Sequence, residues 1–223
     1  MEISTDERFV ASLRYIARKF NLPVKKNGER YKLVLPLTID QDQYLDQIVH
    51  QIVTTMKGQY IHDKIKIKNE TLIRILVNYD KKTDIIIATT LIKITPVMLL
   101  DAVFDFSISK LKSRWDEVIQ LVNENHHKLA QRELFNELLR FLILNMDHKT
   151  KEAHVIYMDK RTKVCNAKLE PYKQTDNNII NTLIDIAPQQ IFIHVDQNLE
   201  TNLVKKIQTI FPNCVCIDYG TML

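Results

Sequence analysis

The stretch from Asn177 to Gly220 constrains the fold most, because two short apolar segments flank one amphipathic helical pattern. Residues 190–195 (QIFIHV) and 214–218 (CVCID) are rich in β-branched and aromatic side chains, which is typical of strands. Between them, apolar residues recur at helical spacing until Pro212. Two strands joined by a helix predict a parallel pair with a right-handed crossover. The strands lack polar alternation, so we expect helices on both faces of the sheet.

Further elements precede this stretch and complete a C-terminal unit. Residues 178–187 have the apolar spacing of a helix, and residues 153–158 and 163–169 have the composition of strands. A polar break at residues 146–151 separates them from the rest of the chain. We therefore assign residues 149–223 to a ββαβαβ unit, a mixed four-stranded sheet with two helices.

The N-terminal part, residues 1–68, predicts a helix–hairpin–helix unit. Ser4 and Glu7 have the spacing of a capping box, which predicts that a helix starts there. Gly28 follows an asparagine between two strand-like runs, which predicts a tight hairpin turn. A second amphipathic helix is expected to begin within residues 38–42.

The middle part, residues 69–148, predicts a helical bundle. Residues 84–94 (DIIIATTLIKI) have the β-branched content of a strand in a helical context, so we favour a helix and keep the strand as an alternative. Residues 97–103 predict a short helix, and Ser107 is expected to cap a longer one. The chain as a whole is therefore expected to be α+β, with an N-terminal helix–hairpin–helix unit, a central helical bundle and a C-terminal sheet.

The order of four segments in the second half of the chain carries a family resemblance. They are LLRFLI (138–143), AHVIYMD (153–159), NTLIDIAPQQIFIH (181–194) and IQTIFPNCVCI (207–217). This order resembles the sporulation protein YtxC family of endospore-forming bacteria. The resemblance implies a role in sporulation and supplies no catalytic residues. Family members often end in a cysteine-rich tail, but this chain has Asp218 and Thr221 at the comparable places, so we expect no metal there.

Composition excludes several other classes of protein. With only three glycines, the chain lacks the glycine-rich loops that cradle phosphates. Three cysteines without a disulfide spacing indicate a reducing compartment. No apolar run reaches the roughly 18 residues that a membrane span needs, and the first residues, MEISTDERF, are too polar for a secretory signal. We therefore expect a cytoplasmic protein with no membrane segment and no bound cofactor.

His194 and Asp196 form the candidate ligand site. They lie at the carboxyl end of the strand at residues 190–195, where α/β sheets often bind ligands. The alternative is a histidine that is simply hydrogen-bonded at the end of a strand.

A zinc site is an alternative interpretation of the cysteines and histidines in the same predicted sheet. Cys214 and Cys216 share one face of a strand, and Cys165, His154 and His194 lie on other strands. A Cys-x-Cys pair on an apolar strand is, however, typical of two small buried side chains. We therefore assign no metal.

A local excess of positive charge near the N-terminus is the second candidate site. The net charge of the chain is only +4, so no whole domain is strongly basic. The candidate basic patch comprises Arg14, Arg18, Lys25, Lys26, Arg30 and Lys32. These residues predict either a solvated helix end and hairpin tip or a surface that binds phosphates.

Three functions follow from these observations. We favour a non-catalytic, sporulation-associated protein of a spore-forming bacterium that acts through protein partners. The first alternative is an accessory factor that binds nucleic acid weakly through the basic patch. The second is an enzyme with its site at His194 and Asp196. Catalytic sequence motifs are absent, which is why the non-catalytic role is preferred.

Overall fold

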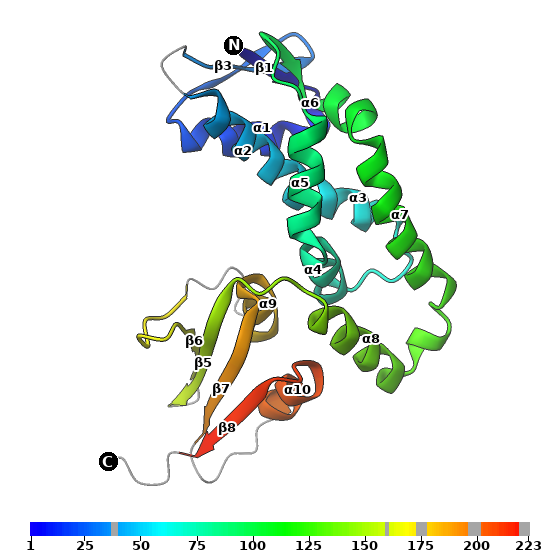
Figure 1. The fold of residues 1–223 in the computed structure, drawn as a ribbon, viewed down its shortest axis with the longest axis vertical. Coiled ribbons are helices and arrows are strands. Elements are labelled where there is room, and N and C mark those ends of the chain that lie inside the picture. Colours follow the sequence, from blue (N-terminus) through cyan, green and yellow to red (C-terminus); the bar gives the residue numbers. More distant parts are fainter. Residues whose placement is uncertain (37–39, 159–160, 173–177, 196–201, 219–223) are drawn as a thin grey trace. The chain divides into compact units, whose positions relative to one another are not determined.

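The computed structural model describes residues 1–36, 40–158, 161–172, 178–195 and 202–218. Helices and two mixed sheets confirm the expected α+β class (Figure 1). The chain divides into two compact units: unit 1 is Met1–Lys66 with Lys81–Glu124, and unit 2 is Ile67–Asp80 with Asn125–Leu223. This division differs from the three predicted regions, 1–68, 69–148 and 149–223, because the helices of the middle region are shared between the two units.

Unit 1 contains a four-stranded sheet with the strand order β2-β3-β1-β4. The strands are β1 (Glu2–Thr5), β2 (Val24–Asn27), β3 (Arg30–Val34) and β4 (Val97–Leu99). β1 is antiparallel to β3 and parallel to β4. The predicted hairpin is confirmed, and Gly28 at its tip has φ +61°, a conformation that glycine adopts without strain. One face of the sheet is buried through Ile3, Leu33 and Met98, which are register neighbours.

Two helix predictions are wrong at this sheet. The capping box at Ser4 and Glu7 does not form, because residues 2–5 are β1. The helical start is instead Asp6, whose carboxylate accepts a hydrogen bond from the Arg8 N–H at 3.0 Å. Residues 97–103 begin as strand β4 and not as a helix, and Ser107 ends a π-helix and does not cap α7. In both places pairing between distant segments overrides the local helical signal.

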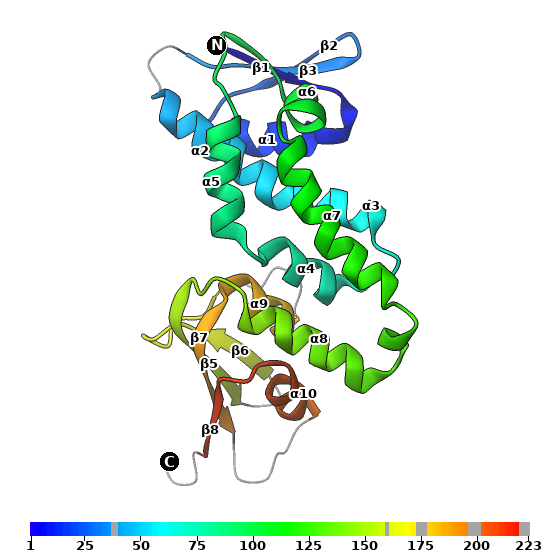
Figure 2. The same cartoon turned by 45° about the vertical axis from the view of Figure 1, so that its right-hand side comes forward.

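Helices make up the rest of unit 1 (Figure 2). They are η1 (Glu7–Phe9), α1 (Val10–Lys19), α2 (Gln41–Gln51), the π-helix η2 (Ile52–Met56), α3 (Lys57–Lys64), α5 (Lys81–Leu91), α6 (Leu100–Ala102), the π-helix η3 (Val103–Ser107) and α7 (Ser109–Glu124). α1 packs against β1 and β3, and α5 packs against α2, η2 and α7. The helix favoured for residues 84–94 is confirmed by α5.

A buried ion pair joins three helices of unit 1. The Nζ atom of Lys57 on α3 lies 2.6 Å from Oδ2 of Asp84 on α5, and both side chains are only 3% exposed. The same carboxylate oxygen accepts a hydrogen bond from the indole N–H of Trp115 on α7 at 2.9 Å. The Lys57 ammonium also lies 5.7 Å from the centroid of the Trp115 ring. The buried charges are thus paired and hydrogen-bonded, as burial requires.

Unit 2 contains the predicted ββαβαβ unit. Its elements are β5 (Thr150–Met158), β6 (Arg161–Cys165), α9 (Ile179–Ile186), β7 (Pro188–Val195), α10 (Asn202–Ile210) and β8 (Cys214–Asp218), preceded by α4 (Glu70–Asn78), η4 (Lys128–Ala130) and α8 (Arg132–Leu144). The strand order is β6-β5-β7-β8, with β5, β7 and β8 parallel and β6 antiparallel. The mixed four-stranded sheet with two helices is confirmed.

The ends of α9 follow ordinary capping chemistry. The side chain of Asn178 accepts hydrogen bonds from two backbone N–H groups of the first turn. At the other end Ala187 adopts the left-handed conformation, and Pro188 then starts β7. The ammonium of Lys149 donates to the carbonyl of Asp185 at 2.7 Å and so satisfies one carbonyl of the last turn.

The two crossover helices of this sheet lie on one face, not on both faces as predicted (Figure 1). The chain moves from β5 to β7 to β8 in a single direction across the sheet. Right-handed crossovers in one direction place their helices on the same side. Ala153, Val155, Ile191 and Ile193 are buried on that side. The alternate residues of β5 and β7, which include His154 and His194, therefore belong to the other face.

We predict that Lys57→Met lowers the free energy of unfolding of unit 1 by about 3–5 kcal/mol, because it leaves the buried Asp84 carboxylate without its cation. The double variant Lys57→Met with Asp84→Asn removes both charges and keeps an acceptor for Trp115. Its loss is expected to be smaller than that of the single variant. Urea unfolding followed by the fluorescence of Trp115, the only tryptophan of the chain, measures both.

Lys110→Met is the matched control, because Lys110 is an exposed lysine on α7. It is expected to change stability by no more than about 0.5 kcal/mol. An equal effect of Lys57→Met and Lys110→Met would show that the buried pair does not hold unit 1 together.

Candidate functional site

The structure brings His194 together with His154 on the face of the unit 2 sheet opposite α9 and α10. His194 lies near the carboxyl end of β7, and His154 lies on the neighbouring strand β5. Nδ1 of His154 is 2.8 Å from Nε2 of His194. The ring centroids are 5.1 Å apart, and the ring planes differ by 17°. The nitrogen–nitrogen contact of 2.8 Å and the distance from each nitrogen to the centre of its own ring add up to the 5.1 Å between the centroids. The two rings therefore lie edge to edge in nearly one plane.

A carboxylate completes a chain of three polar side chains. Oε1 of Glu152 lies 3.5 Å from Nε2 of His154, at the outer limit of a hydrogen bond. A carboxylate only accepts, so a proton on Nε2 of His154 suits this contact, and Nδ1 then accepts from the Nε2–H of His194. Burial, and secondly the charge of His154, lower the pKa of His194 below its ordinary value of 6.5. His194 is therefore neutral at pH 7 and suited to accept a proton.

The other predicted members of this site are Asp196, Cys214 and Cys165. Asp196 lies outside the described residues. Cys214 is the register neighbour of Ile191, so it lies on the face covered by helices. Cys165 does neighbour His154, but burial raises the pKa of its thiol and keeps it protonated. Among the described residues, no three His, Cys, Asp or Glu side chains have an arrangement that holds a metal ion.

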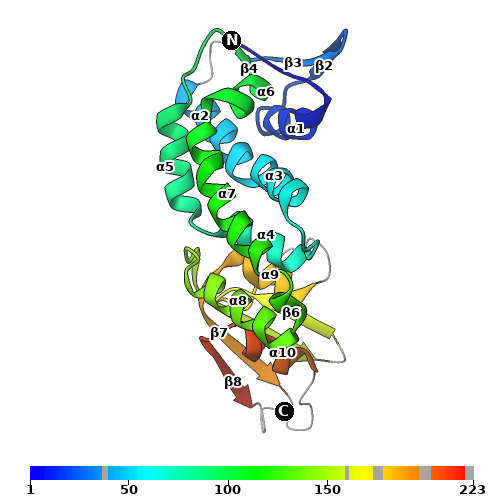
Figure 3. The same cartoon turned by 90° about the vertical axis from the view of Figure 1, so that its right-hand side faces the viewer.

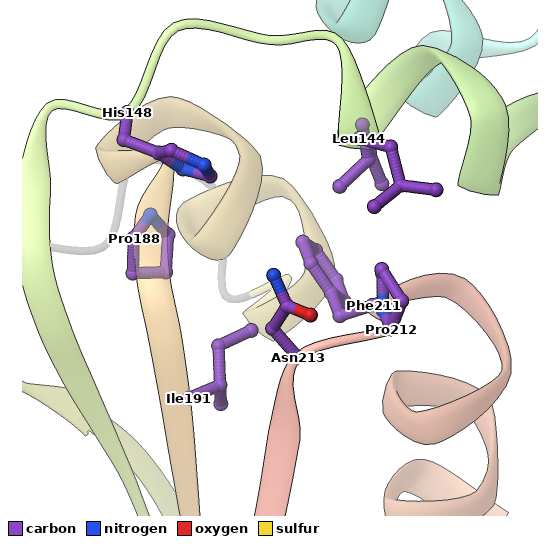
Figure 4. A pocket seen from close by; sticks show the side chains of 8 residues that line it. Leu144, His148, Pro188, Ile191, Phe211, Pro212 and Asn213 are labelled. Carbon is purple, nitrogen blue, oxygen red and sulfur yellow. The ribbon is translucent and has the colours of Figure 1, made fainter.

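A small cavity in unit 2 lies away from the histidine pair. Figure 4 shows His148, Pro188, Phe211 and Asn213 around it. Its volume is about 30 Å³. A site of this size holds a water molecule, whereas ligand pockets commonly exceed about 300 Å³. We therefore do not assign a substrate to it.

The structure divides the candidate basic patch between two faces of the β2–β3 hairpin. Tyr31 and its register neighbour Lys26 lie on the face toward α1, where Arg14 and Lys26 approach the Tyr31 ring to 5.9 Å and 5.3 Å. Arg18 lies one turn after Arg14 on α1, so both can face the same ligand. Three cations of the patch are therefore gathered on this side.

The other three cations of the patch are Lys25, Arg30 and Lys32. They alternate with Lys26 and Tyr31 along the two strands, so their side chains lie on the opposite face of the hairpin. The guanidinium of Arg30 forms an ion pair with Asp101, and the ammonium of Lys32 forms one with Glu2 at 3.0 Å. Lys25, the register neighbour of Lys32, is exposed. A continuous row of six phosphate-binding cations is thus not formed.

An apolar groove beside strand β4 is a feature of unit 1 that the sequence did not predict. Its volume is about 410 Å³. Three of the side chains that line it are prominently exposed: Val97 by 58%, Leu99 by 42% and Phe106 by 77%. The other lining residues are Leu91, Lys93, Thr95, Met98, Ala102, Val103 and Ser107. The lining residues come from the end of α5, from β4 and α6, which follow one another along the chain in Figure 3, and from η3, which leads into α7.

Sequence reasoning missed this groove because it read residues 97–103 as a helix. In a helix Val97 and Leu99 would not share a face, whereas in a strand they do. The available signal was Pro96, which disfavours the helical conformation in the residue before it and suits the start of an edge strand.

We predict that unit 2 loses stability as the pH falls below about 6.5. The folded pKa of His194 lies below that of the unfolded chain, so the unfolded state binds more protons in this window. The stability that neutral His194 contributes is therefore fully present above about pH 6.5. It is lost as the pH falls toward the pKa of His194 in the folded protein. Amide hydrogen exchange of Ile191 and Ile193 between pH 7 and pH 5 measures this loss. His194→Gln should flatten the pH dependence.

The matched control is His62→Gln, because the His62 side chain on α3 is 60% exposed. It is expected to leave the exchange of the β7 amides unchanged. A His194→Gln protein with the same pH dependence as the parent would contradict a role for this imidazole.

We predict weak and salt-sensitive binding of nucleic acid at most. Arg14, Arg18 and Lys26 share one face, and three phosphate contacts imply a slope of log K against log salt of about −2 to −3. Fluorescence anisotropy with a labelled single strand and duplex at several salt concentrations tests this. Arg14→Glu with Arg18→Glu should abolish binding, whereas Lys25→Glu with Lys32→Glu on the other face should not. A slope near −5 would contradict the division of the patch.

Comparison with known proteins does not add a relative. No family model, no curated protein and no solved structure matches this chain. Within the described part of the chain, no helix is both long enough and apolar enough to span a bilayer. The resemblance to the YtxC family therefore stays a prediction from the order of segments in the sequence.

Proposed function

We propose that this protein is a non-catalytic, sporulation-associated protein of a spore-forming bacterium, and that it acts by binding a protein partner at the groove beside β4. The process comes from the YtxC resemblance of residues 138–217. A cytoplasmic location fits the reducing environment that its cysteines indicate.

The groove is the observation that carries this proposal. Val97, Leu99 and Phe106 expose large apolar side chains around one depression. Single exposed apolar residues are ordinary, but a contiguous set around a hollow is typical of a surface that binds another protein. Lys93, Thr95 and Ser107 supply the polar rim that such surfaces have.

An enzymatic role is the second candidate, and one observation favours it. The chain from Glu152 through His154 to His194 orients two imidazoles and leaves the buried one neutral at pH 7. This arrangement suits His194 as a general base. His194 can pass a proton on to His154, which the carboxylate of Glu152 orients. The partner role is preferred because the groove gathers exposed apolar side chains around a binding space. A hollow of about 520 Å³ in unit 2 is lined by Glu152, but neither His154 nor His194 lines it.

We predict that Phe106→Ser abolishes capture of the partner. Phe106 is 77% exposed, so its replacement removes binding surface without opening a cavity in the core. Affinity purification of the tagged full chain from sporulating cells, followed by quantitative mass spectrometry, measures the amount of each protein retained. Proteins that bind at the groove should fall at least about tenfold in the variant.

Phe141→Ser is the matched control, because Phe141 is a 56% exposed phenylalanine on α8 of unit 2. It should retain the same proteins as the parent chain. A partner that survives Phe106→Ser but is lost with Phe141→Ser would move the binding surface to unit 2 and contradict the groove.

A further inference from the structure

Strand β4 is an edge strand whose outer backbone groups point away from the sheet. It pairs with β1 on one side only, as the last strand in the order β2-β3-β1-β4. The N–H of Glu2 donates to the carbonyl of Pro96 at 2.8 Å, so alternate residues of this segment face β1. The backbone groups of Val97 and Leu99 therefore point toward the open edge. The carbonyl of Val97 already accepts a hydrogen bond from the Thr95 hydroxyl at 2.7 Å, so an added strand would pair with the Val97 N–H and with the backbone of Leu99.

The groove lies beside this edge and provides space for the side chains of an added strand. Leu91, Val103 and Phe106 line it from α5 and η3. Successive side chains of a strand point to opposite faces, so every second side chain of a chain laid along β4 can enter the groove. Backbone pairing and apolar pockets together are the means by which sheet edges bind extended peptides.

Charge selects the kind of chain that fits. Lys93 is the one charged residue among those described as lining the groove. The nearby carboxylates of Asp101 and Asp105 are already paired with Arg30 and Arg8. Lysines beside a sheet edge disfavour the pairing of that edge with a second copy of itself. A segment with acidic residues would instead complement Lys93.

We propose that β4 accepts a fifth strand: an extended segment of a partner protein with alternating apolar side chains and acidic flanking residues. This rests on the proposed function, since it specifies how the groove holds its partner. The partner's backbone pairs with Val97 and Leu99, its apolar side chains enter the groove, and its carboxylates lie near Lys93.

The test uses the full chain and synthetic peptides. The probe is a short labelled peptide of alternating valine and threonine with aspartates at both ends. A second peptide carries N-methyl groups on the amides that would face β4, and a third carries lysines in place of the aspartates. Anisotropy gives the affinities, and hydrogen exchange of the Val97 and Leu99 amides reports on backbone pairing. We expect the aspartate peptide to bind about tenfold more tightly than either of the others and to protect both amides.

Two exchanges of charge on the protein complete the test. Lys93→Glu should reverse the preference, so that the lysine peptide binds more tightly. Lys82→Glu makes the same change on α5 outside the groove lining and should leave the preference unchanged. Both residues are exposed, so neither variant is expected to unfold.

Several outcomes would overturn the proposal. Equal affinity of the N-methylated peptide, without protection of Val97 and Leu99, would show that strand addition does not occur. If Phe106→Ser still abolished partner capture in that case, the groove would remain the partner site and only the strand mechanism would fail. Absence of binding by all three peptides, or a dimer of the chain joined through β4, would also reject the acidic strand as occupant.

Discussion

The buried contact between Lys57 and Asp84 is the interaction on which the packing of unit 1 depends. Burying two charged groups with 3% exposure costs free energy, which their contact at 2.6 Å offsets. The indole N–H of Trp115 donates a hydrogen bond to the same carboxylate oxygen. The three groups come from α3, α5 and α7. A shift of any one helix along its neighbours would leave a charge or an indole N–H buried without that partner. The polar contact thus restricts these helices to one register, whereas apolar side chains alone tolerate several.

That register also determines the shape of the groove. Leu91 is the last residue of α5, and Phe106 lies in η3 just before α7, so both positions follow from how these two helices are held. Phe104, also in η3, is buried, and its ring centroid lies 4.9 Å from that of Phe9 and 6.4 Å from that of Trp115. Residues two apart on a helix point in different directions, so η3 buries Phe104 while Phe106 remains exposed at the groove.

The C-terminal unit could be predicted from the sequence because its signals are local. Pro188 separates a helical period from a strand run, and Asn178 caps the helix, so α9 and β7 were found within two residues of their bounds. β1 and β4 could not be predicted in this way. β4 is a strand because it pairs with β1, and Glu2 and Val97 are neighbours although 95 positions separate them (97 − 2 = 95). β1 also pairs with β3, whereas the capping spacing of Ser4 and Glu7 suggests a helix instead. Periodicity carries no information on such distant partners.

The same limit applies to the sites. His194 was recognisable from its place at the end of a strand, but its contact with His154 depends on the register of β5 and β7, which the sequence did not specify. The groove required β4 to be known as an edge. Strand β4 has only three residues. Short edge strands, and lysine or proline at an edge, prevent a sheet from pairing with unrelated chains. Here Lys93 and Pro96 accompany exposed Val97, Leu99 and Phe106. An edge that only had to be protected would not need these apolar side chains, so their presence favours a surface that excludes most chains and admits one of matching charge.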